Sequence, residues 1–251
     1  MSGTHEERTD RTVQKVHLAP LWSSAAGAAG LALIGWLSGL SAVGWLAGLL
    51  YLGVSNALLA RGLRRRRTAR FGPANAVTAV RSTLVALVTA VVATSFTAPI
   101  SVTLLLGLTI PALALDALDG WVARRTGTIS ELGARFDMEV DAFLLLTLAA
   151  YVAPRVGWWV IIVGVLRYAF VVAGWMLPWM RAQLPDRHWR KVVTAAAGIA
   201  LAIAASGLMP WWVEYAACLL ALALLIESFG RDVLWLVVHR EQAAEAAGRL
   251  V

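Results

Sequence analysis

Acidic residues gather in one stretch of an otherwise apolar chain. Six of the fifteen Asp and Glu residues lie between Asp116 and Asp141, and most of their neighbours are apolar. A carboxylate at membrane depth is costly and by default marks a functional site. Asp116 and Asp119 are three residues apart. Asp137 and Asp141 are four apart, so on helices each pair would project from one face.

Carboxylates that converge in this way repel one another if all are ionised. One or two divalent cations would relieve the repulsion. Oxygen ligands favour Mg²⁺, with Mn²⁺ or Ca²⁺ as alternatives, and the absence of His and Cys from this stretch argues against zinc.

Small residues share the predicted faces of the aspartates. Gly120 and Ala123 continue the first face, and Gly133 lies one turn before Asp137. Small side chains let a bulky ligand approach the backbone and let helices pack tightly. Arg124 stands beside them. A metal-bridged anion next to an arginine is the recurring arrangement for phosphoryl transfer.

The elements that must carry these residues are long apolar segments. Hydrophobic residues make up 59% of the chain, charged residues 15%, and the mean hydropathy is +0.71. A soluble domain has about a quarter charged residues. We therefore expect an all-α fold, a polytopic membrane helical bundle. Its eight apolar segments lie near residues 21–38, 41–60, 76–97, 101–124, 132–153, 157–179, 189–208 and 211–229.

Basic residues mark alternate links between these segments. The net charge of +7 lies largely in four such links, whereas the links between them are short and nearly uncharged. Loop arginines and lysines indicate the cytoplasmic side, so both termini and the active site are expected there, in a multi-pass protein of the cell membrane. Anionic headgroups explain the charge better than nucleic acid, which we do not expect as a partner.

The acidic stretch resembles the signature of the CDP-alcohol phosphatidyltransferase family. The matching run is Asp116-x-x-Asp119-Gly120-x-x-Ala123-Arg124, eight residues, then Gly133-x-x-x-Asp137-x-x-x-Asp141. The stretch Gly72–Thr78 is similar to the family's Pro-Asn-x-x-Thr, with one additional residue between Pro and Asn.

The resemblance implies a six-helix catalytic core over residues 71–230. Residues 21–70 would add two N-terminal transmembrane segments, as a hairpin, and a basic linker. Polar cytoplasmic tails are expected at 1–20 and 231–251. A homodimer is also what the family resemblance implies.

The resemblance also implies roles for single residues. Asp116, Asp119 and Asp137 would be metal ligands, with two Mg²⁺ ions expected. Asp141 would take the proton from the acceptor hydroxyl and also bind metal. The acceptor oxygen would attack the β-phosphorus and CMP would leave. The CDP site would be lined by Asp119, Gly120, Ala123, Arg124, Gly133, Asn75 and Thr78.

Basic residues further along the chain bear on the acceptor. Arg167 lies inside the sixth apolar segment, and Arg190 and Lys191 lie at the start of the seventh. Family members that use phosphorylated acceptors hold the phosphate with basic residues on these helices. We therefore expect a phosphorylated alcohol, such as glycerol phosphate or inositol phosphate. A structural salt bridge is an equal alternative for Arg167.

The expected function is transfer of a phosphatidyl group from a CDP-linked lipid, CDP-diacylglycerol, to an alcohol. A variant transfers a CDP-linked head group to a diacylglycerol. Two other classes remain as alternatives. Membrane prenyl transfer also uses Mg²⁺, but it needs two Asp-rich sets well apart in sequence, and this chain has one compact set. A cation transporter is disfavoured because Arg124 would oppose cation entry.

Overall fold

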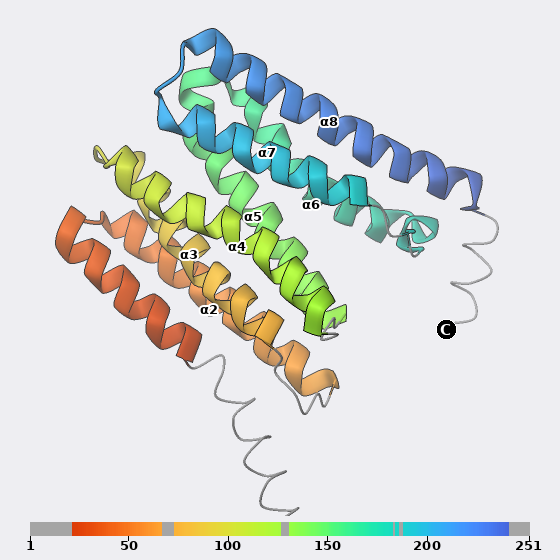
Figure 1. Ribbon diagram of the computed structural model, residues 1–251, viewed down its shortest axis with the longest axis horizontal. Helices are drawn as coiled ribbons and strands as arrows, with labels where there is room; N and C mark the ends of the chain where they lie inside the picture. Colours follow the sequence, from red (N-terminus) through yellow and green to blue (C-terminus); the bar gives the residue numbers. More distant parts are fainter. Residues whose placement is uncertain (1–21, 67–72, 127–130, 183, 186–187, 241–251) are drawn as a thin grey trace, which may run out of the picture. The chain divides into compact units, whose positions relative to one another are not determined.

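Helices account for every regular element in the described part of the computed structural model, which comprises residues 22–66, 73–126, 131–182, 184–185 and 188–240 (Figure 1). This confirms the expected all-α fold. The α-helices are 22–38, α2 (Ala42–Arg66), α3 (Pro73–Ser95), α4 (Val102–Thr126), α5 (Glu131–Val156), α6 (Ile161–Met176), α7 (His188–Ser206) and α8 (Trp211–Val238). Two 3₁₀ helices are η1 (Trp158–Val160) and η2 (Pro178–Arg181).

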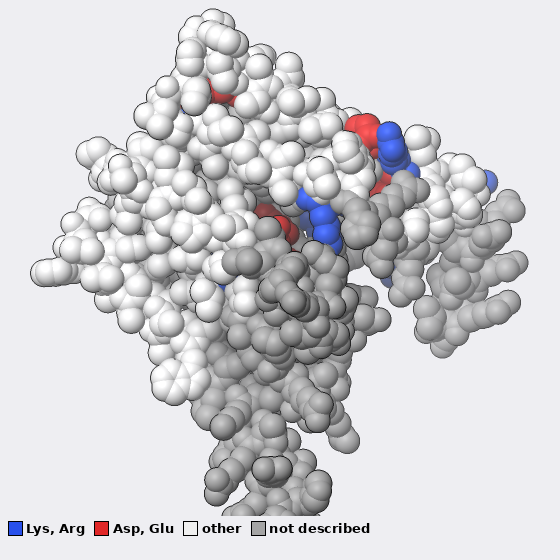
Figure 2. All heavy atoms as spheres, in the orientation of Figure 1, with Lys and Arg blue, Asp and Glu red and all other residues white. Residues whose placement is uncertain are grey.

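Five stretches in the described residues are long and apolar enough to cross a membrane, so the protein is a multi-pass integral membrane protein. They are Ala42–Arg61, Val77–Ser95, Trp158–Met176, Trp189–Ser206 and Trp211–Val238. A shorter apolar stretch, Val102–Asp116, lies in α4. Many large apolar side chains are exposed, and charged side chains are sparse on the described part of the face in Figure 2. Such a surface suits lipid better than water.

The last helix continues beyond the expected end of its segment at residue 229, to Val238. Its additional turns contain charged residues, which is why the apolar pattern alone ended the segment too early. Arg231 forms an ion pair with Glu227 one turn earlier. Asp232 is buried and pairs with Arg190 of α7 at 3.5 Å. Paired charges are compatible with a helix that continues past its apolar part.

The chain divides into two compact units, residues 1–141 and 142–251. In the first unit, helix 22–38 and α2 form a hairpin, α2 packs on α3, and α3 packs on α4. Gly39 makes the hairpin turn with a φ of 68°, a conformation that favours glycine. This division into two units does not test the domain boundaries expected from the sequence, which stay a prediction.

Glycines on α2 let the hairpin approach α3 closely. A Cβ atom added at Gly44 would lie 2.7 Å from the carbonyl oxygen of Ala90, and it would also clash with Thr94. One added at Gly48 would lie 3.0 Å from the Ala90 Cβ. Small residues four apart permit this kind of contact between membrane helices. The hairpin therefore packs directly on the helix α3, whose apolar span is 67% buried.

In the second unit, an ion pair joins three helices near their ends. Arg155 of α5 pairs with Glu214 of α8 at 3.1 Å and also donates a hydrogen bond to the carbonyl oxygen of Ala204 on α7. The Glu214 side chain is buried, so the arginine supplies the charge that its carboxylate needs. Aromatic packing joins α6 to α8, where the rings of Phe170 and Phe229 lie 5.6 Å apart.

The close packing at Gly44 gives a first prediction. Gly44→Ala should destabilise the protein by about 1–3 kcal/mol, the usual cost of overpacking, because the new methyl group meets the α3 backbone. The measurement is the melting temperature of the purified protein in detergent. Gly53→Ala is the matched control on the same helix, since no atom lies within 4 Å of a Cβ added there. Equal melting temperatures for the two variants would contradict the packing argument.

Candidate active site

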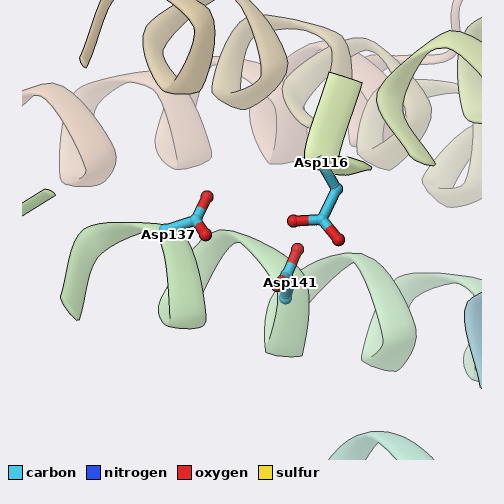
Figure 3. Close-up of side chains that lie close together, drawn as sticks. All are labelled: Asp116, Asp137 and Asp141. Carbon is cyan, nitrogen blue, oxygen red and sulfur yellow. The ribbon is translucent and has the colours of Figure 1, made fainter. Parts of the chain in front are cut away.

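Three of the four predicted aspartates meet in the first unit. Asp116 comes from α4, whereas Asp137 and Asp141 stand one turn apart on α5 (Figure 3). Each offers a carboxylate oxygen, and these three oxygens all lie within 4.8 Å of one another. The side chains are 29%, 24% and 22% exposed in chain order. The spacing on two helices thus produces the convergence that the sequence predicted for these three residues.

An arginine that the sequence analysis missed lies among these carboxylates. Arg81 of α3 is completely buried. One guanidinium nitrogen pairs with Asp116 at 2.5 Å. The other pairs with Asp141 at 2.9 Å and also contacts the Asp137 carboxylate and, at 3.2 Å, the Asp137 carbonyl oxygen. A charge within an apolar helix was the available signal. Arg167, inside the sixth apolar segment, carries the same signal.

The donor set fits a divalent cation. Three carboxylates and one guanidinium leave a formal charge of −2 on the described side chains of the site. All three candidate ligand atoms are hard oxygen atoms, and partial exposure leaves them accessible. Mg²⁺, Mn²⁺ and Ca²⁺ prefer such ligands. An acidic triad that holds a divalent metal is therefore compatible with the observed arrangement.

Other predicted donor-site residues lie on the same three helices. Thr78 is buried on α3, one turn before Arg81. Gly133 lies one turn before Asp137 on α5. The remaining residues are placed by their helices alone, since their side chains lie outside the described part: Asn75 on α3 and Asp119, Gly120, Ala123 and Arg124 on α4. The metal and CDP roles of the whole set stay a prediction.

The predicted acceptor residues belong to the second unit, where Arg167 and Arg190 line two different cavities. One cavity of about 250 Å³ is lined by Trp189, Arg190, Ser228, Arg231 and Asp232. A larger one of about 580 Å³ is lined by Arg167, Phe170, Val171, Gly174, Trp175, Met180 and Arg181. Lys191 is exposed and lines neither of these two cavities. The structure therefore does not gather the three basic residues around one of these cavities.

The two cavities differ in charge. Arg190 and Arg231 of the smaller cavity face acidic partners, Asp232 and Glu227 respectively. The larger cavity is lined by two arginines and by no acidic residue among those described. Arg181 is fixed there by a hydrogen bond of 2.7 Å to the carbonyl oxygen of Gly174. Two arginines are thus the charged side chains that an anionic ligand would meet in the larger cavity.

Comparison with protein families gives one match. A family model described as CDP-alcohol phosphatidyltransferase matches residues 71–225, a range that includes α3, the acidic stretch and Arg81. Comparison with curated proteins and with solved structures gives no match. The family consists of transferases for substituted phosphate groups that use a divalent metal, which leaves prenyl transfer and cation transport without support. The matched residues make up more than half of the sequence, and the chain therefore belongs to the CDP-alcohol phosphatidyltransferase family.

Proposed function

We propose that this protein transfers a phosphatidyl group from CDP-diacylglycerol to a phosphorylated alcohol and releases CMP. The observation that best supports this proposal is that Asp116, Asp137 and Asp141 meet on two helices inside the range matched by the family model. The membrane-spanning helices support a lipid donor, because such a substrate reaches the site from the bilayer.

Two Mg²⁺ ions are the proposed cofactors. Asp116, Asp119, Asp137 and Asp141 would hold them, and three of these carboxylates already converge. When bound, the ions supply positive charge to the two phosphates of the donor. The CDP group would lie along Asn75, Thr78, Gly120, Ala123, Arg124 and Gly133, with Arg124 on the diphosphate.

Asp141 is the proposed general base. It takes the proton of the acceptor hydroxyl while the acceptor oxygen forms a bond to the β-phosphorus and the bond from that phosphorus to CMP breaks. The Asp141 side chain is 22% exposed, so an acceptor can reach it.

A phosphorylated acceptor is favoured by the arginine-lined cavities of the second unit. We place the acceptor phosphate at Arg167, because its cavity has two arginines and no described acidic residue in its lining. Arg190, which pairs with Asp232, and Lys191 are the other candidates. Transfer of a CDP-linked head group to a diacylglycerol is the alternative reaction.

The proposed setting is the cell membrane, with both termini and the site on the cytoplasmic side and a homodimer as the assembly. The alternation of basic and uncharged links supports this orientation. The catalytic core would comprise residues 71–230, to which residues 21–70 add the hairpin and basic linker.

The reaction gives a second prediction. Purified protein with Mg²⁺, CDP-diacylglycerol and a panel of free and phosphorylated alcohols should release CMP with a phosphorylated acceptor. Asp141→Asn should lower the rate by about 10²–10⁴-fold, the usual contribution of a general base. Glu139→Gln on the same helix is the matched control and should keep activity. Release of CMP only from a CDP-linked head group with diacylglycerol would replace the proposal by its alternative. Full activity of Asp141→Asn would refute the role of Asp141 as general base.

The acceptor site gives a third prediction. Arg167→Gln should raise the KM for the phosphorylated acceptor by about ten- to a hundredfold, the value of a charged hydrogen bond, and leave the KM for CDP-diacylglycerol nearly unchanged. Arg240→Gln removes an exposed arginine outside the family match and serves as the control. If Arg190→Gln raises this KM and Arg167→Gln does not, the phosphate belongs to the smaller cavity.

A further inference from the structure

The buried guanidinium of Arg81 uses the same groups that are expected to bind metal. It contacts the Oδ1 atom of Asp116, of Asp137 and of Asp141. These three carboxylates also form the described cluster that fits a metal ion. The guanidinium thus lies among the same carboxylate oxygens that a divalent cation would need as ligands.

The two cations oppose each other electrostatically. A guanidinium and a divalent ion that share carboxylates only a few ångströms across repel strongly, because the surrounding helices screen charge poorly. Each carboxylate oxygen directed at Arg81 is also less available as a ligand. Binding of a divalent ion to these oxygens therefore has to weaken or break the arginine contacts.

The cluster of three carboxylates is also unfavourable when no cation is present. Three carboxylates on the facing parts of α4 and α5 would repel one another. Arg81 comes from a third helix, α3, and its planar fork reaches all three. Its full burial means that water does not replace it in this role.

We propose that Arg81 is a built-in counter-ion that holds the three aspartates together in the metal-free protein and gives up their oxygens to the divalent cation. Arg81 is thus a positioning residue that preserves the geometry of the site and lowers its metal affinity. The inference rests on the metal site of the proposed function and does not depend on the identity of the acceptor.

A plain structural salt bridge predicts something different. In that case loss of Arg81 would lower stability equally with and without metal, and metal affinity would not increase. A counter-ion predicts lower stability without metal, recovery when metal is bound, and tighter metal binding. Binding and melting measurements distinguish the two without reference to catalysis.

The experiment measures Mn²⁺ binding to the full chain in detergent by electron paramagnetic resonance, and melting temperature in chelator and in saturating Mn²⁺. Arg81→Gln should tighten Mn²⁺ binding by about tenfold or more, since one competing positive charge is removed. Its melting temperature should fall in chelator and return towards the wild-type value in Mn²⁺. Arg81→Lys keeps the charge without the three-way fork and should bind Mn²⁺ with intermediate affinity.

Arg155→Gln is the matched control, because it removes an arginine from another ion pair, with Glu214 in the second unit. It should lower the melting temperature by the same amount in both conditions and leave Mn²⁺ affinity unchanged. Unchanged or weaker Mn²⁺ binding by Arg81→Gln overturns the inference. If that variant does not fold, weaker binding by Arg81→Lys overturns it. Wild-type protein that binds no Mn²⁺ overturns the proposed metal site and the inference together.

Discussion

The buried guanidinium of Arg81 holds three carboxylates of the first unit together. Arg81 is the side chain at which α3, α4 and α5 meet through charge, because it contacts one carboxylate of α4 and two of α5. A charge in an apolar helix is unfavourable unless it is paired, so these helices are constrained to the rotations that present Arg81 to the aspartates. Apolar packing alone, with side chains of similar shape around each helix, specifies rotation much less strongly.

This constraint also gives the N-terminal hairpin a structural role. The hairpin packs through Gly44 and Gly48 on the helix that carries Arg81, and its polar contacts continue along the same interface. Ser41 reaches Thr94 at one position, and Ser82, next to Arg81, reaches Tyr51 at another. The hairpin thus packs along the apolar span of α3, which is mostly buried, and limits the movement of that helix.

Much of the fold followed from the sequence, because long apolar segments and basic links reflect the bilayer directly. The convergence of Asp116, Asp137 and Asp141 also followed, since helical spacing determines which carboxylates share a face. The contacts of Arg81 did not follow: a charge within an apolar helix indicates that a partner is needed, but local sequence does not tell which distant acidic group that partner is. The end of α8 was missed for the same reason, since Asp232 continues the helix through a partner on α7. The predicted acceptor residues stand on different helices, and the lining of separate cavities by Arg167 and Arg190 has no sequence signature.

The length of α8 has a consequence for how a polar molecule would reach the second unit. The helix has 28 residues, which at ~1.5 Å per residue is about 42 Å, whereas the hydrocarbon core is ~30 Å thick. Ser228 lies about 26 Å along the helix axis from Trp211, an aromatic residue of the kind found at the membrane interface. With Trp211 at one interface, the smaller cavity, lined by Ser228 and Asp232, would lie towards the opposite interface. A water-soluble compound can enter it from the aqueous phase, whereas a diacylated lipid keeps its chains in the hydrocarbon layer.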